Sequence, residues 1–96
     1  MAGSVIQTAE DECFVCRTTR GLHTHHIFYG VANRRISDRM GYTVKLCYEH
    51  HEGATGVHAN PNRDLDLMLK QTAQKHYEAN HGSREDFIKT FGKSWL

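Results

Sequence analysis

Three histidines within four residues are the most unusual chemical feature of the sequence. His23, His25 and His26 stand in the stretch GLHTHHIFYG at residues 21–30, and the 96-residue chain contains eight histidines. Near neutral pH an imidazole carries little charge, yet it can bind a metal ion or accept a proton. The stretch therefore indicates metal binding, proton transfer or both.

Four other residues have the spacing of a zinc site. Cys13 and Cys16 are separated by two residues, and Cys47 and His50 repeat this spacing later in the chain. Three thiolates and one imidazole suit zinc and would join two distant segments. His51 remains an alternative to His50, because a spacing one residue longer also occurs in zinc sites. The competing interpretation is a redox or unliganded CxxC pair, with Cys47 simply buried at a strand end.

The composition predicts one small globular domain. A chain of this length has a thin core and often depends on a metal or a disulfide. Three cysteines cannot all pair, and no stretch resembles a signal peptide or a membrane span. We therefore expect a cytoplasmic protein that contacts no membrane. The formal charge of +1 does not by itself indicate a nucleic-acid partner, but Arg34, Arg35 and Arg39 lie close together.

Two strands are expected in the first half of the chain. Bulky and aromatic residues after Gly21 predict a strand near residues 21–29, and the alternation in YTVKL predicts another at residues 42–46. Residues 30–41 are expected to form a polar, arginine-rich connection, with a short helical turn between Ser37 and Gly41. Residues 1–11 are expected to be a loose lead-in.

Helices are expected in the second half. A helix begins after Cys47 and is interrupted by Gly53 and Gly56, and a long helix covers residues 63–80. A last helix begins at Ser83 with a capping-box spacing to Asp86 and ends at Gly92. The apolar side of the long helix is expected to comprise Leu65, Leu67, Met68, Leu69, Thr72, His76 and Ala79.

The histidines could divide metal binding and proton transfer between them. Adjacent strand residues such as His25 and His26 point to opposite faces, so they share a site only if the strand ends or bulges there. One imidazole could then bind a divalent cation while its neighbour takes a proton from water, a combination that hydrolyses phosphodiesters. The competing interpretation is a pair of surface histidines, and His23 is expected to be a hairpin side chain or a donor to a ligand.

His51 and His58 are the candidates for further ligands of this cation. Seven residues of straight helix span about 10 Å, which is too far for two ligands of one ion. His58 can therefore contribute only if the chain folds back, which Gly53 and Gly56 would allow.

The order of these motifs resembles the HNH endonuclease family, also called ββα-metal or His-Me finger nucleases. The resemblance rests on CFVC at 13–16, HHIFYG at 25–30, LCYEHH at 46–51 and GVH ending at residue 58. The downstream stretches DLDLMLKQ and DFIKTFGKSWL are similar to small phage and prophage members. The resemblance implies an α+β fold for a single domain of residues 1–96. Its zinc-knuckle-stabilised ββα-metal core would cover residues 13–58, with additional helices at residues 63–96.

The resemblance also implies roles for single residues. His25 would bind the catalytic cation with His51, and His26 would be the general base. The structural zinc would be held by Cys13, Cys16, Cys47 and His50, with His50 where many members have cysteine. The sequence departs from the family at the middle motif letter, because Tyr42 stands where an asparagine that braces the loop of the base is usual, and Asn33 lies earlier.

These features together lead to the expectation of a metal-dependent DNA endonuclease of phage or prophage origin, acting in the cytoplasm of a bacterial host. Arg34, Arg35 and Arg39 would contact the DNA backbone, and phage packaging or recombination proteins are candidate partners. The active-site ion would be Mg²⁺, Mn²⁺, Ni²⁺ or Zn²⁺, with imidazoles favouring the transition metals. The alternative is a non-catalytic, zinc-stabilised module that binds nucleic acid or protein. A metal-storage or sensor protein would explain the histidines but not the ordered Cys-His framework.

Overall fold

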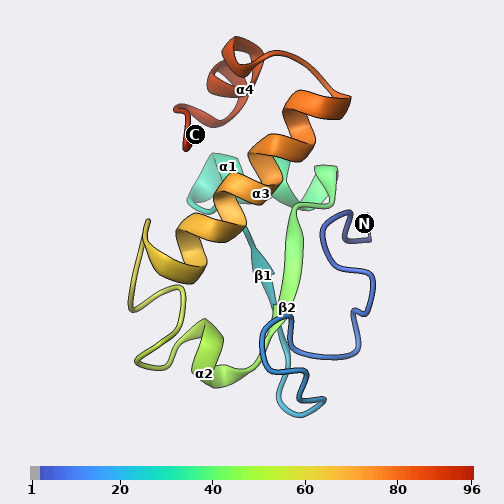
Figure 1. Ribbon diagram of the computed structural model, residues 1–96, viewed down its shortest axis with the longest axis vertical. Coiled ribbons are helices and arrows are strands. Elements are labelled where there is room, and N and C mark those ends of the chain that lie inside the picture. The colour runs from blue at the N-terminus through green and yellow to red at the C-terminus, as the bar shows by residue number, and fades with distance from the viewer. Residues whose placement is uncertain (1–2) are drawn as a thin grey trace.

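A two-stranded antiparallel sheet runs through the middle of the α+β fold (Figure 1). The computed structural model describes residues 3–96. Strand β1 (His23–His26) pairs with β2 (Thr43–Leu46), so that His23 lies opposite Leu46 and His26 opposite Thr43. In this part of the chain the helices are α1 (Val31–Met40), α2 (Tyr48–His51), α3 (Asp64–Asn80) and α4 (Arg84–Phe91). None of them combines the length and apolar content needed to cross a bilayer.

Helix α1 occupies the segment for which a polar connection was expected. It begins after Gly30 and ends at Gly41, which has the left-handed conformation with φ of 77°. Ser37 does not start a helical turn but is fully buried inside this helix. Its hydroxyl donates to the carbonyl oxygen of Tyr42 and accepts the N–H of Phe28. The prediction for residues 30–41 is therefore wrong, because buried contacts with both strand ends stabilise a helix whose exposed face is highly charged.

The core lies where α1, α3 and α4 meet the upper end of the sheet (Figure 1). Phe28 packs against Phe87 and Phe91, with ring centroids 5.4 and 4.3 Å apart. The expected alternation of the second strand is confirmed, since its apolar residues all belong to the core. The largest fully buried apolar side chains are Tyr42, Phe87, Ile27, Leu46, Leu69, Val44 and Val57.

Helix α3 has the expected extent but a different buried face. Met68, Thr72 and Ala79 are exposed, so the apolar side predicted from the sequence is partly wrong. The buried residues are Asp66, Leu69, Lys70, Ala73, Gln74 and Tyr77. The two charged ones form an ion pair of 3.0 Å between Lys70 Nζ and Asp66 Oδ2. Buried charges are tolerated only when paired in this way, so polar partners decide which face of α3 turns inward.

The predicted beginning and end of the last helix are confirmed. Ser83 and Asp86 form a reciprocal capping box at the start of α4. Gly92 follows the helix with φ of 103°, a conformation that favours glycine. The cap directs Phe87 and Phe91 into the core while Ile88 stays on the surface.

The segment before Cys13 contains no helix or strand within its described residues but is not loose. Ser4 donates its hydroxyl proton to the carbonyl oxygen of Thr43 at 2.6 Å, and the N–H of Lys45 donates to Gln7 Oε1 at 2.7 Å. Gln7 is buried. Side-chain hydrogen bonds thus hold this segment against β2, where the sequence predicted a loose lead-in. Residues 1 and 2 of that lead-in lie outside the described part.

Candidate functional site

A cluster of three cysteines and one histidine lies where the CxxC segment meets the end of β2. The Sγ atoms of Cys16 and Cys47 are 3.7 Å apart, and His50 Nδ1 lies 3.7 Å from Cys13 Sγ and 3.2 Å from Cys47 Sγ. Two thiolates on one tetrahedral zinc would be about 3.8 Å apart, since each Zn–S bond is about 2.3 Å. The cluster is therefore compatible with a structural metal. His50, and not His51, joins the cysteines.

Backbone hydrogen bonds hold this cluster in place. The N–H of Phe14 donates to the carbonyl oxygen of Lys45 at 2.8 Å, which attaches the CxxC segment to β2. The chain then turns tightly through Arg17, whose φ is 65° and whose N–H donates to the carbonyl oxygen of Cys13. Cys47 comes directly after β2 and starts α2, so one strand end and one helical turn place Cys47 and His50 together.

The electrostatics of the thiols favour a bound cation. Burial alone would raise the pKa of Cys13, but hydrogen bonds from backbone N–H groups outweigh it and lower that pKa to about 6. A backbone hydrogen bond at Thr18 lowers the pKa of Cys16, but burial and the neighbouring thiols Cys13 and Cys47 raise it by more. Adjacent thiolates repel one another, and a divalent cation between them removes that repulsion.

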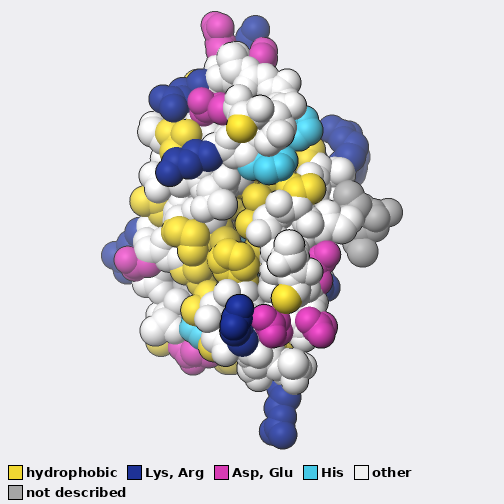
Figure 2. Space-filling view, turned by 45° about the vertical axis from the view of Figure 1, so that its right-hand side comes forward, with side chains coloured by type: hydrophobic (Ala, Val, Ile, Leu, Met, Phe, Trp, Pro, Cys, Tyr) yellow, Lys and Arg dark blue, Asp and Glu magenta, His cyan; other side chains and the backbone are white. Residues whose placement is uncertain are grey.

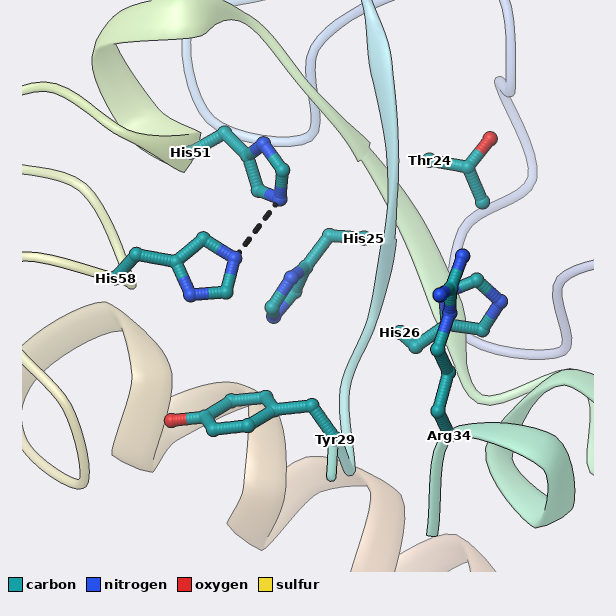
Figure 3. Close-up of a pocket in the computed structure, with 7 residues that line it drawn as sticks. All are labelled: Thr24, His25, His26, Tyr29, Arg34, His51 and His58. Carbon is teal, nitrogen blue, oxygen red and sulfur yellow. Dashed lines mark hydrogen bonds between the residues drawn. The ribbon is translucent and has the colours of Figure 1, made fainter. Parts of the chain in front are cut away.

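A second cluster contains three imidazoles and no cysteine. His25 projects from β1 toward His51 at the end of α2 and toward His58 (Figure 3). His51 Nε2 and His58 Nε2 are 3.1 Å apart, and one nitrogen from each of the three rings lies within 4.8 Å of the others. His25 Nε2 is buried and has no hydrogen-bond partner among residues 3–96. A cation bound by all three rings would satisfy this nitrogen, so the residues fit a divalent metal.

The chain folds back after α2 and brings His58 to His51. The N–H of Val57 donates to the carbonyl oxygen of His50 at 3.0 Å, and the N–H of His58 donates to that of His51 at 3.2 Å. A Cβ atom at Gly56 would lie 2.8 Å from the carbonyl oxygen of Glu49, so this turn requires glycine. The chain therefore does fold back, as the sequence required if His58 is to lie beside His51.

Two of the three rings, His25 and His51, are kept in the neutral form that a metal requires. Burial, followed by the neighbouring His51 and His58, lowers the pKa of His25 to about 3. Burial also lowers the pKa of His51, again with contributions from neighbouring imidazoles. Neutral rings keep a lone pair free for a cation, so His25 and His51 are already in their ligating form at neutral pH.

His23 contacts the cluster from outside. Its Nδ1 lies 2.9 Å from His51 Nδ1, and His23, His51 and Glu52 also have ligand atoms close together. Two nitrogens on one tetrahedral zinc would be about 3.3 Å apart, since each bond is about 2.0 to 2.1 Å. The shorter distance is that of a hydrogen bond with one shared proton. It occupies Nδ1 of His51 and leaves Nε2 to face His25 and His58.

His26 lies on the opposite side of β1 from His25 (Figure 3). The strand stays regular through His26, so the two rings separate as neighbouring strand residues do, without the bulge considered from the sequence. Both rings nevertheless line one cavity of about 240 Å³, because β1 ends beside it. The residues lining this cavity are Thr24, His25, His26, Tyr29, Arg34, His51 and His58.

Asp38 is the partner of His26, a role that no sequence motif indicated. Its Oδ1 lies 3.2 Å from His26 Nε2. The two residues are brought together only because residues 31–40 form a helix beside the end of β1. If residues 31–40 had been predicted as a helix, Asp38 would have been expected one turn after Arg34 and Arg35, on the same face of that helix.

The three arginines differ in their distance from the cavity. Arg34 lines it, and Arg34 and Arg35 also border an adjoining opening of about 550 Å³ with His26 and Asp38. Arg39 borders neither. Within residues 3–96 none of these side chains forms an ion pair or hydrogen bond. Figure 2 shows another face, where Lys and Arg are dispersed among acidic side chains.

Tyr42 and Asn33 both form hydrogen bonds away from His26. The hydroxyl of Tyr42 lies 3.0 Å from His76 Nδ1, and Asn33 Nδ2 donates to the carbonyl oxygen of Phe91. Neither side chain is hydrogen-bonded to His26. Both connect the sheet or α1 to the C-terminal helices.

The low pKa of His25 predicts a loss of stability in acid. Because its folded-state value lies near 3 and the unfolded value near 6.5, the unfolded chain binds more protons between these values. Stability should therefore fall as the pH drops below about 6.5, by about 1.4 kcal/mol at about pH 5.5 relative to about pH 7.5. Chemical denaturation of the native protein and of His25→Gln at both pH values, without added divalent ions, measures this. Equal losses in the two proteins would contradict the assignment to His25.

Comparison with known proteins identifies no relative of this chain. No family model, no curated protein and no solved structure matches it. The side chains of the two clusters and of the cavity are therefore the basis for assigning a function.

Proposed function

We propose that the protein is a metal-dependent DNA endonuclease. One observation carries this proposal. Three imidazoles, from His25, His51 and His58, converge at one end of a cavity whose other end holds His26 and Arg34, and the Arg34 side chain has no ion pair within residues 3–96. Such a cavity offers a place for a cation, a proton acceptor and a phosphate contact next to one another. Phosphodiester hydrolysis uses these three together.

The Cys3His cluster is proposed to hold the structural zinc. Its soft thiolate donors, tetrahedral separations and lack of a carboxylate suit zinc better than calcium or magnesium. The metal would tie the CxxC segment to β2 and α2. Strand β2 pairs with β1, which carries His25, and α2 carries His51. In this proposal the scaffold metal and the catalytic ion have separate ligand sets.

In the proposed reaction His26 acts as the general base. A cation held by His25, His51 and His58 would supply positive charge to stabilise the phosphate oxygens and the departing oxygen. His26 takes a proton as the O–H bond of the attacking water breaks, and the water oxygen forms a bond to phosphorus. The bond from phosphorus to the leaving oxygen breaks, and that oxygen is protonated from solvent. Arg34 would hold the phosphate through its guanidinium.

Several parts of the proposal follow from the sequence resemblance. Mg²⁺, Mn²⁺, Ni²⁺ and Zn²⁺ are the candidate ions, and three imidazole ligands favour the last three. A phage or prophage origin, action in a bacterial cytoplasm and partners in packaging or recombination are proposed on the same basis. The main alternative is a zinc-stabilised module that binds nucleic acid or protein without cleaving it. Such a module would not need His26, an imidazole outside the cation's ligand set, beside a cation site.

Zinc analysis tests the proposed scaffold. The protein purified without added metal should contain about one tightly bound zinc per chain and should unfold when that zinc is chelated. His50→Ala should lose this zinc, whereas the matched variant His51→Ala should retain it, because only His50 lies with the cysteines. Elemental analysis and circular dichroism measure both effects. Retention of zinc in His50→Ala would exclude the proposed ligand set.

Plasmid nicking tests the enzymatic proposal. Cleavage should require a divalent ion, should stop with EDTA, and should fall by about 100- to 10,000-fold in His26→Ala while folding and structural zinc are preserved. His51→Ala should also lose cleavage, because the cation loses a ligand. The exposed His81 lies outside the cavity, so His81→Ala serves as the control with native activity. A native protein that binds DNA but cleaves none with any candidate ion would favour the binding module.

The arginines should contribute to DNA binding in the order of their distance from the cavity. Removing one phosphate contact reduces the slope of log affinity against log salt concentration by about 0.9. Arg34→Ala should show this reduction, and Arg35→Ala a similar or smaller one. Arg39→Ala has the same charge change but lies away from both openings, so it should bind nearly as the native protein does. Titrations at several salt concentrations measure the slopes, and equal effects at Arg34 and Arg39 would refute this order.

A further inference from the structure

The hydrogen bond between His26 and Asp38 has a defined direction. A carboxylate only accepts hydrogen bonds, so the proton between His26 Nε2 and Asp38 Oδ1 belongs to the imidazole. A neutral ring carries one proton. With that proton on Nε2, the lone pair of His26 is on Nδ1.

The surroundings of Asp38 make this contact selective. Arg34 and Arg35 precede Asp38 by four and three residues on α1, the spacing at which helical side chains can pair. Neither arginine forms an ion pair with Asp38, and His26 is its sole side-chain partner within residues 3–96. The carboxylate of Asp38 therefore bonds to the imidazole, even though both arginines lie at helix positions from which they could pair with it.

The His26–Asp38 pair is partly shielded from water, which strengthens the hydrogen bond between the two side chains. The side chain of His26 is 15 % exposed and that of Asp38 is 35 % exposed. A hydrogen bond in such a setting restrains the ring more than one on an open surface would. The His26–Asp38 hydrogen bond is not needed to attach α1 to the sheet, because Ser37 already forms hydrogen bonds at both strand ends.

We propose that Asp38 is a positioning residue for His26, holding the ring in the Nε2–H form so that Nδ1 accepts the proton from the attacking water. This inference rests on the proposed nuclease function and extends it to a residue outside the sequence motifs. When Nδ1 takes the proton, the ring becomes a cation, and the carboxylate of Asp38 stabilises it. Asp38 itself keeps its charge and does not touch the substrate. It also belongs to neither metal cluster in the described chain.

Nuclear magnetic resonance tests the hydrogen bond without any need for DNA cleavage. In ¹⁵N-labelled, zinc-containing protein near pH 8, where free imidazole is neutral, the Nε2–H proton of His26 should give a signal protected from exchange. His26→Gln assigns the signal. Asp38→Ala should abolish it, whereas Asp11→Asn, at an exposed aspartate outside the cavity, should leave it unchanged. A native protein with the proton on Nδ1, or an Asp38→Ala spectrum with His26 unaltered, would overturn the proposal.

Cleavage kinetics test what the hydrogen bond does. Asp38→Ala should lower kcat by about 10- to 100-fold, the usual cost of removing a carboxylate that orients an imidazole, with KM for DNA changed little. Asp38→Glu should recover part of the rate. In the His26→Ala background, Asp38→Ala should cause no further loss, because the carboxylate acts only through the ring. A rise in KM with kcat unchanged, or an additional loss without His26, would show that Asp38 acts elsewhere.

The two measurements separate this inference from the proposed function. If the native protein cleaves no DNA with any candidate ion, the nuclease proposal fails together with the kinetic role of Asp38. The ring N–H signal would still report whether the carboxylate orients His26. If the native protein cleaves DNA and Asp38→Ala cleaves equally well, the nuclease proposal stands and the positioning role is refuted.

Discussion

The candidate site depends on the pairing of β1 with β2. Each strand has four residues, and so short a two-stranded sheet is marginal by itself in water. It is held at one end by the aromatic core around Phe28 and at the other by the Cys3His cluster that follows Leu46. This pairing fixes the register in which His25 lies opposite Val44 and His26 opposite Thr43. A slip by one residue would exchange their faces and separate His25 from the other imidazoles.

The alternation of the strand explains how adjacent histidines differ in their surroundings. His25 turns toward the fold-back loop, where burial and nearby imidazoles keep it neutral and ready to bind a cation. His26 turns toward α1, where the carboxylate of Asp38 and the side chains of Arg34 and Arg35 lie. The end of the strand then lets both rings reach one cavity. Two imidazoles of the same intrinsic chemistry thus acquire different surroundings from one backbone geometry.

A buried polar network supports the cavity from the side of α3. Tyr29 donates its hydroxyl proton to Asp66 Oδ2, and the ammonium group of Lys70 lies 4.3 Å from the centre of the Tyr29 ring. Burial and Asp66 raise the pKa of Tyr29 to about 12, so its hydroxyl remains a donor. Lys70 also adds a small contribution to the low pKa of His25. The C-terminal helices therefore contribute to the electrostatics of the cavity as well as to the core.

The sequence by itself determined the features that depend on local spacing. The two ligand pairs of the zinc spacing, the alternating second strand, the capping box at Ser83 and the role of glycine in the return to His58 could all be inferred from neighbouring residues. Only the tertiary structure decided between His50 and His51, turned the connection at residues 31–40 into a helix, buried Asp66 and Lys70, and placed Asp38 beside His26. These outcomes depend on partners distant in the chain, and the free energy of burying a polar group depends on whether such a partner is there.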